Sequence, residues 1–233
     1  MTIWYTGEIK KKKTDIIRNY HIVNLDITHL DRILNLQEEI YQGIEDKETF
    51  VKSEKEEFEK FFNENDGNVL GFCVEDEGLV GYRINSFNRE NINYYQKMLE
   101  LDASKDMLYF DATIIRSDYR GNHLQRKAIR ISLHYATRNP NFHYAFSTVS
   151  PKNIPSMKSL LYNRVHIVKA KNIYGGRERY IALYNRDSKV HKKRNRIYIP
   201  VMDFKSVSEK LDEGYVGIHI KGTKDEYLLE MVR

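Results

Sequence analysis

The feature that most constrains the fold of this chain is a long apolar strand that runs directly into a tight loop and an amphipathic helix. The run MLYFDATIIR (107–116) is rich in β-branched and aromatic residues, which predicts a strand. The loop SDYRGNH follows, and apolar residues then recur near one helical stripe from Leu124 to Tyr135. This order predicts a helix N-terminus that is presented by the end of a strand.

The start of that helix is a candidate anion site. Backbone N–H groups in the first turn of a helix have no intrahelical partner, and the helix dipole adds positive charge there. Glycine lets a phosphate approach without a Cβ in the way, and His123 and Gln125 would crowd such a site unless they point outward. The alternative interpretation is a plain strand–turn–helix with a solvated Arg120. The candidate donors are the backbone N–H groups of Gly121, Asn122, His123, Leu124, Gln125 and Arg126.

The other elements predict an α/β (α+β) fold. Strands are expected at 20–25, at 143–150 and in hairpins joined by DEG and by Gly175-Gly176, with helices after Asp26 and Ser53, around INYYQKMLEL (92–101) and in NIPSMKSLLYN (153–163). We therefore expect a mixed, mostly antiparallel central sheet with helices on both faces. No internal repeat is evident. The expected divisions are an arm at 1–19, a main domain at 20–186, and a basic linker with a small β-α-β appendage at 187–233.

Composition limits the partners and the compartment. One cysteine, Cys73, excludes an internal disulfide and fits a cytoplasmic protein, and no apolar run is long enough to cross a membrane. The net charge of +5 favours anionic partners in general. The runs KKKK (10–13) and HKKRNR (191–196) are more typical of solvated surface or linker than of a nucleic-acid site. The 8 histidines show no ligand spacing that would indicate a metal.

Two motifs on these elements resemble the GNAT superfamily of acyl-CoA-dependent N-acyltransferases, over roughly residues 20–186. The first is an Arg or Gln, two residues, a Gly, one residue and a Gly or Ala, at the start of a helix. Arg120 matches, while His123 and Gln125 stand at the two small-residue positions. The second is an Asn with a small residue three positions later, in a helix that ends in Gly-Phe. Asn153 and Ser156 match, and Arg164-Val165 replaces Gly-Phe.

The resemblance implies an N-acetyltransferase in which an acceptor amine attacks acetyl-CoA directly. Arg120 and the amides that follow would hold the pyrophosphate. Ile115, near Ile114 and Arg116, would be the main backbone contact of the pantetheine and the candidate donor to the acetyl carbonyl oxygen. Asn153 would contact the pantetheine, and Lys158 would reach the phosphates or remain a solvated lysine.

Three side chains are candidates for proton transfer. Asp111 lies within the apolar strand, on the alternating face of Thr113 and Ile115, where burial would raise its pKa toward that of a base; a structural, hydrogen-bonded role is equally open. The family often has a Tyr seven residues after the Asn, but Leu160 occupies that position here. Tyr162 is the remaining candidate acid and Tyr174 a weaker one, with packing as the alternative for both.

The sequence leaves the acceptor and the assembly open. Expected partners are acetyl-CoA and a small-molecule or peptide amine, with a homodimer possible and nucleic acid or membrane not expected. Two other functions remain: a non-catalytic acyl-CoA-binding module, and an acetyltransferase directed to RNA or aminoacyl-tRNA. The appendage is interpreted as a dimer contact or as a cover for the sheet edge.

Overall fold

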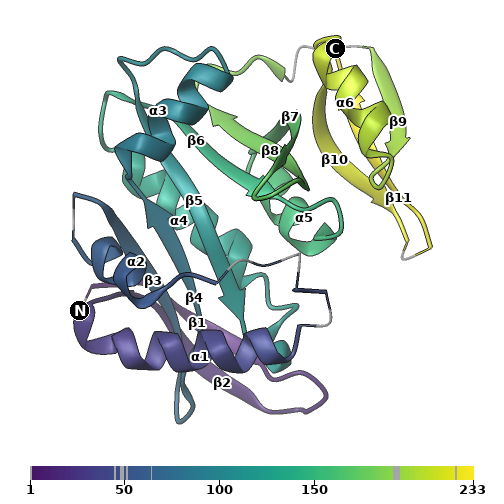
Figure 1. Cartoon of the computed structure of the whole chain (residues 1–233). Helices are drawn as coiled ribbons and strands as arrows, with labels where there is room; N and C mark the ends of the chain where they lie inside the picture. The colour runs from purple at the N-terminus through teal and green to yellow at the C-terminus, as the bar shows by residue number, and fades with distance from the viewer. Residues whose placement is uncertain are drawn as a thin grey trace. The chain divides into compact units, whose positions relative to one another are not determined.

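The computed structural model of the chain describes residues 2–44, 46–47, 50, 52–63, 65–190, 195–223 and 225–233. The chain divides into two compact units (Figure 1). The first unit comprises Met1–Ala103 with Leu108–Tyr135, and the second comprises Ser104–Met107 with Ala136–Arg233. The three-part division expected from the sequence stays a prediction, and most of the HKKRNR run lies outside the described residues.

The first unit is built on antiparallel strands that follow one another in chain order. Each strand pairs with the next in the chain: hairpins join β1 to β2 and β3 to β4, and helical segments connect β2 to β3 and β4 to β5. The N-terminal arm contributes a full strand. The strands are β1 (Ile3–Lys10), β2 (Ile17–Leu25), β3 (Gly67–Val74), β4 (Gly78–Ser86) and β5 (Asp106–Ile115).

Helices pack on both faces of these strands because the strands alternate two sets of apolar side chains. One face carries Val23, Val69 and Tyr82, and it packs against Ile33 and Phe58 of the first two helices. The other face carries Tyr20 and Phe72, which pack against the later helix. The helical elements of this unit are η1 (Ile27–His29), α1 (Leu30–Gln42), α2 (Lys55–Phe61), α3 (Arg89–Met98), η3 (Ser117–Tyr119) and α4 (Leu124–Ala136).

The second unit holds the remaining strands and two helices. The strands lie in the order β6 (Phe142–Val149), β8 (Arg177–Asn185), β7 (His166–Ile173), β10 (Val216–Gly222), β11 (Tyr227–Val232) and β9 (Arg196–Pro200), with antiparallel pairing between neighbours. The helices are α5 (Ile154–Tyr162) and α6 (Phe204–Asp212). The C-terminal appendage is therefore β-α-β-β, one strand more than the sequence predicted.

The expected fold class is confirmed: an α/β fold with mostly antiparallel strands and, in the first unit, helices on both faces. Among the described residues, no helix combines the length and the apolar character that a membrane span requires.

Candidate functional site

The loop between β5 and α4 adopts a left-handed backbone at two positions. Gly121 has φ 97° and His123 has φ 59°, and α4 begins at the next residue, Leu124. His123 thus keeps the conformation that a glycine would supply at that position of the motif, at the strain cost that a side chain brings. Its side chain is exposed, and a Cβ placed on Gly121 would meet no atom within 4 Å. The side chains therefore leave open space beside the backbone of the loop.

The loop is fastened to the N-terminal strand. The side chain of Asn122 donates to the carbonyl of Lys10 at 2.9 Å and to that of Tyr119 at 3.0 Å, and it accepts from the N–H of Lys10 at 3.2 Å. The N–H of Lys12 donates to the carbonyl of Asp118 at 2.7 Å. The lysine run 10–13 is therefore the turn between β1 and β2, docked on the loop, and it is not a linker.

Ion pairs fix the base of the loop. Nη2 of Arg116 lies 2.6 Å from Glu77 and 2.7 Å from Asp118, and Nζ of Lys11 lies 2.9 Å from Glu77. Burial raises the pKa of Glu77, but hydrogen bonds from Lys11 and Arg116 outweigh it and hold that pKa at about 2. The side chain of Arg116 is thus committed to two carboxylates, which leaves only its backbone as a candidate ligand contact.

At the end of β5, the backbone of one residue is directed away from β4. Arg116 donates its N–H to the carbonyl of Val80 at 2.9 Å, and the register pairs Ile114 with Tyr82. Hydrogen-bonded and non-hydrogen-bonded pairs alternate along an antiparallel ladder. Arg116 belongs to a hydrogen-bonded pair, so its neighbour Ile115 does not, and the N–H and C=O of Ile115 point away from β4. Nε of Arg120 donates to that C=O at 3.0 Å. Of the three residues predicted to bind the pantetheine through their backbone, only Ile115 has this orientation.

A β-bulge changes the predicted position of Asp111. Arg83 pairs with Thr113, and Asn85 pairs with Phe110, so two residues of β5, Asp111 and Ala112, oppose one residue of β4. Both side chains of such a pair lie on the same side of the sheet. Asp111 therefore shares the α1/α2 face of Ala112, and the prediction that it shares the face of Thr113 is wrong, because simple alternation does not hold across a bulge.

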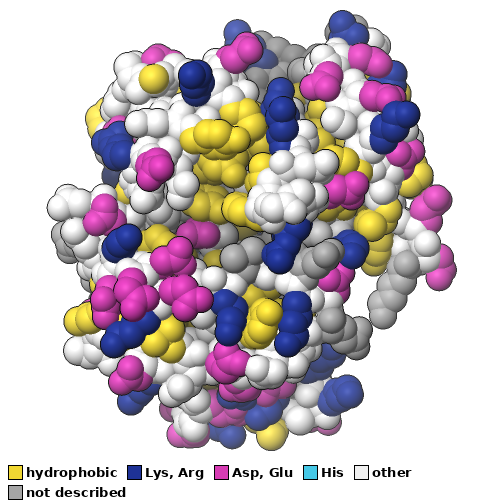
Figure 2. Space-filling view, in the orientation of Figure 1, with side chains coloured by type: hydrophobic (Ala, Val, Ile, Leu, Met, Phe, Trp, Pro, Cys, Tyr) yellow, Lys and Arg dark blue, Asp and Glu magenta, His cyan; other side chains and the backbone are white. Residues whose placement is uncertain are grey.

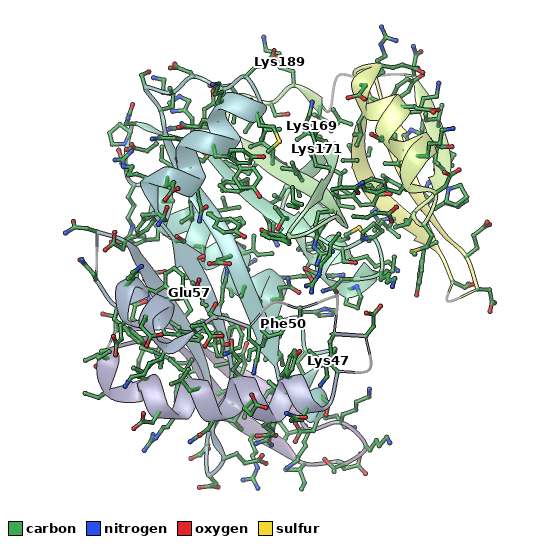
Figure 3. All side chains as sticks on the ribbon, in the orientation of Figure 1. Lys47, Phe50, Glu57, Lys169, Lys171 and Lys189 are labelled. Carbon is green, nitrogen blue, oxygen red and sulfur yellow. The ribbon has the colours of Figure 1, made fainter. Side chains whose placement is uncertain are left out.

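The surroundings of Asp111 favour its neutral form. Burial, followed by the charge of Glu57 on α2, raises the pKa of Asp111 to about 6, against the opposing effects of Tyr109 and Arg83. Glu57 is labelled on α2 in Figure 3, and Figure 2 shows acidic side chains gathered over the same helix. The exposed members of this acidic patch are Glu54, Glu56, Glu57 and Glu59.

Arg83 is a buried cation that the sequence analysis did not identify. It is 2% exposed, and burial lowers its pKa to about 9, so it stays protonated at neutral pH. It donates from Nε to Asn85 at 3.1 Å and from Nη1 to Thr113 at 2.8 Å, and it lies 4.3 Å from the centre of the Phe110 ring. A single charge within the apolar run GLVGYRINSF was the available signal, because a buried charge needs partners.

In the second unit, Asn153 is the N-cap of α5, and its side chain accepts from the N–H of Ser156 at 3.2 Å. Lys158 extends from the same helix, with Nζ 4.3 Å from the centre of the Tyr227 ring.

Tyr162, in the last turn of α5, is 67% exposed. Tyr174 lies in the β7–β8 hairpin with its hydroxyl 3.1 Å from that of Thr148. Among the described residues, no group of three His, Cys, Asp or Glu side chains is arranged to hold a metal.

Comparison with family models and with curated protein sequences gives no match. Solved structures do match. NAA60 of Arabidopsis thaliana in complex with acetyl-CoA aligns with 72% of this chain and 99% of its own, with a TM-score of 0.55 at 17% identity. A GNAT family acetyltransferase from Listeria monocytogenes covers 77% of this chain and 99% of its own, with a TM-score of 0.54 at 10% identity.

A ribosomal-protein-S5-alanine acetyltransferase from Vibrio fischeri covers 79% of this chain and 98% of its own, with a TM-score of 0.52 at 13% identity. At these identities the likeness concerns the fold. The motif positions identified in the sequence fall on the strand, loop and helices described above. The chain therefore has the fold of the GNAT acetyltransferases.

Proposed function

We propose that the chain is an N-acetyltransferase that transfers an acetyl group from acetyl-CoA to a primary amine. The observation that carries this proposal is the end of β5. There the backbone of Ile115 is turned away from β4, and a left-handed loop leads into the first turn of α4. These groups fit a long, extended ligand with a phosphate end, because Ile115 offers a backbone N–H that points away from β4, and the helix start offers amides. The fold that this chain shares with NAA60, solved with acetyl-CoA, supports the same assignment.

The direction of β5 orders the proposed contacts. The phosphates lie at the loop from Arg120 to Arg126, and the pantetheine runs back along the strand past Ile115. Thr113 is the next residue whose N–H points away from β4, about 7 Å further along the strand. We therefore assign the acetyl carbonyl oxygen to the Thr113 N–H, where a fixed donor stabilises developing negative charge. This moves the predicted donor from Ile115 toward the bulge. Acetyl-CoA supplies the acetyl group as a thioester.

Asp111 is the proposed base. Its carboxylate stands at the bulge, on the α1/α2 face, and a pKa of about 6 leaves it ionised at neutral pH yet more basic than an ordinary carboxylate. It would accept the proton that the acceptor ammonium loses. The acidic patch on α2 favours a cationic acceptor on this face. Tyr162, exposed in the last turn of α5, stays a candidate acid, and Asn153 is proposed to contact the pantetheine from the N-cap position.

The test measures release of the coenzyme A thiol with a panel of amines. The wild-type chain should release thiol with at least one cationic amine, and Asp111→Asn should lower kcat by about 10²- to 10⁴-fold with little change in acetyl-CoA affinity. Asp212→Asn is the matched control, since Asp212 is an exposed carboxylate at the end of α6. Tight acetyl-CoA binding without thiol release on any amine would favour the non-catalytic module instead.

A further inference from the structure

The C-terminal appendage repeats the local structure of the unit that carries Asn153. Asn153 caps α5 with φ −90° and ψ 64°, and Asp203 caps α6 with φ −81° and ψ 71°. Each cap accepts from a serine N–H three residues later, at 3.2 Å from Ser156 and at 3.1 Å from Ser206. Corresponding residues differ by fifty in number throughout. The two helices have the same length and the same entry geometry.

The two helices also end in the same way. Val165 donates its N–H to Leu160 at 3.1 Å, and Tyr215 donates to Lys210 at 3.0 Å, again fifty residues on. The residue before each donor is left-handed, with φ 60° at Arg164 and 89° at Gly214. A two-stranded hairpin follows each helix, β7–β8 after α5 and β10–β11 after α6. The appendage therefore has the element order of 142–185, β-α-β-β.

The strand order places the two copies about a local pseudo-twofold axis. Reading across the second unit, β6-β8-β7 is followed by β10-β11-β9, which is the same order reversed. At the junction, β7 and β10 are antiparallel, and Ile167 pairs with Gly217, its own equivalent fifty residues on. A residue that faces its own equivalent is the signature of an isologous twofold contact. The helices follow the same symmetry, because each packs on a strand of the other copy: α6 on β7 and α5 on β10.

The two residues that meet at this axis, Ile167 and Gly217, differ in size and fit closely against each other. A Cβ on Gly217 would lie 3.1 Å from the Cβ of Ile167 and 3.0 Å from the side chain of Leu229, so a larger residue here would force these neighbours to shift. A homodimer would carry the same residue on both sides of its axis. Glycine against isoleucine is therefore a pairing that two identical chains could not make at this axis.

The second copy differs from the first at the position proposed to bind ligand. Asp203 replaces Asn153, and an ionised carboxylate can only accept hydrogen bonds, so it cannot donate one to a ligand as the amide of Asn153 can. Tyr227, at the start of β11, instead contacts the helix of the first copy. Its ring lies 4.3 Å from Nζ of Lys158. The second copy thus reaches the helix that carries the Asn-x-x-Ser motif.

We propose that residues 196–232 are a second, altered copy of 142–185 that is fused in the place of a partner chain and positions Lys158 through Tyr227. This rests on the proposed function in one respect, namely that acetyl-CoA is the ligand; it adds that Lys158 reaches the phosphates, which the resemblance to the GNAT superfamily implies. Tyr227 is a positioning residue. Its ring holds the ammonium group over β11 and limits the rotamers that a lysine on a helix surface would otherwise sample.

The first measurement is binding by calorimetry to acetyl-CoA and to acetylpantetheine, which carries no phosphate. Tyr227→Leu should weaken acetyl-CoA binding about 2- to 5-fold, which is the range of one cation–π contact, and leave acetylpantetheine binding unchanged. Lys158→Met should do the same, and the double variant should lose no more than Lys158→Met. Tyr227→Phe keeps the ring and should match the wild type. A loss that is equal for both ligands would overturn the positioning role.

The second measurement needs no ligand. Denaturant unfolding of Lys158→Met, Tyr227→Leu and the double variant gives the coupling of the two side chains directly. Measurable coupling supports the contact even if the wild type fails to bind acetyl-CoA, an outcome that would count against the proposed function alone. Binding of acetyl-CoA by the wild type together with zero coupling and an unchanged Tyr227→Leu would overturn this inference alone.

Discussion

Two residues adopt a backbone that their motif positions normally reserve for glycine. His123 has φ 59° and Arg164 has φ 60°. Hydrogen bonds on either side explain how these conformations persist, since Asn122 fastens the loop to Lys10 and Val165 closes the end of α5 on Leu160. The missing glycines made both motifs look incomplete in the sequence, yet the backbone geometry is retained at a cost in strain.

Replacement of His123 by glycine should therefore stabilise the fold. Because a side chain in the left-handed region costs about 1 kcal/mol or more, we expect His123→Gly to raise the free energy of unfolding by roughly that amount. Chemical denaturation measures it. Leu124→Gly, one residue later within α4, should instead destabilise through the lost core side chain. A His123→Gly variant less stable than the wild type would mean that the imidazole makes a compensating contact.

Asp111 links stability and activity through pH. Its pKa is raised in the folded chain, so ionisation costs stability: the cost is absent below the unfolded pKa near 4, grows through about pH 6 and is constant above it. Asp111→Asn should thus be more stable than the wild type at pH 8, by on the order of 2–3 kcal/mol, and no more stable at pH 3.5. Unfolding curves at the two pH values test this. A difference that does not vary with pH would contradict the raised pKa.

The same group sets the expected pH profile of the reaction. The base must be ionised, so kcat/KM should rise with pH and level off above about pH 6, where Asp111 has lost its proton. Initial rates over pH 5–8 measure the profile, with an acceptor whose own amine pKa is known so that its contribution can be subtracted. If kcat/KM does not change around pH 6, Asp111 is not the base.

At the scale of elements, the sequence predicted most strands and helices because their apolar patterns are regular. It did not predict the bulge at Asp111–Ala112, since one extra residue leaves no trace in the alternation of this apolar run. The docked lysine turn was missed as well, because charge runs are usually solvated. Asn122 was predicted as a ligand contact through its backbone, and the structure adds that its side chain fastens the loop.

The repeat was missed for a related reason. The two copies share caps, helix length and the left-handed helix end, but Asn153 is replaced by Asp203 and Arg164 by Gly214. The repeated information lies in backbone geometry, which different residues can satisfy, rather than in residue identity. For this reason no repeat is evident in the sequence, although the backbone geometry supports the one that we propose.

The junction between β7 and β10 gives a prediction at this scale. Gly217→Val should destabilise by about 1–3 kcal/mol, because its side chain would overlap Ile167 and Leu229. Gly43→Ala is the matched control, since its Cβ would meet nothing closer than 3.6 Å at an ordinary φ of −85°. Thermal or denaturant unfolding compares the two. If the two substitutions lower the free energy of unfolding equally, the packing around Gly217 is loose enough to accept a side chain.

For the whole molecule, we expect a monomer. The β7 edge, which a partner strand could extend, is filled by β10. Among the described strands, β1 and β9 are the edge strands, because each stands at an end of the strand order. β9 is only five residues long and ends in Pro200, and β1 runs into the lysine turn; short length, proline and lysine all oppose edge pairing. Light scattering should give the chain mass of 27.7 kDa at micromolar concentration. A mass twice as large would show that another surface assembles.

The pairing of Ile167 with Gly217 carries a consequence for how this chain can vary. In an assembly of identical subunits, every substitution occurs on both sides of the twofold axis, so it must be tolerated in both positions. In this chain, residue 167 and residue 217 can be substituted independently. The first copy can keep Asn153, which we propose contacts the ligand, while the second copy can change independently and keep side chains that support the first.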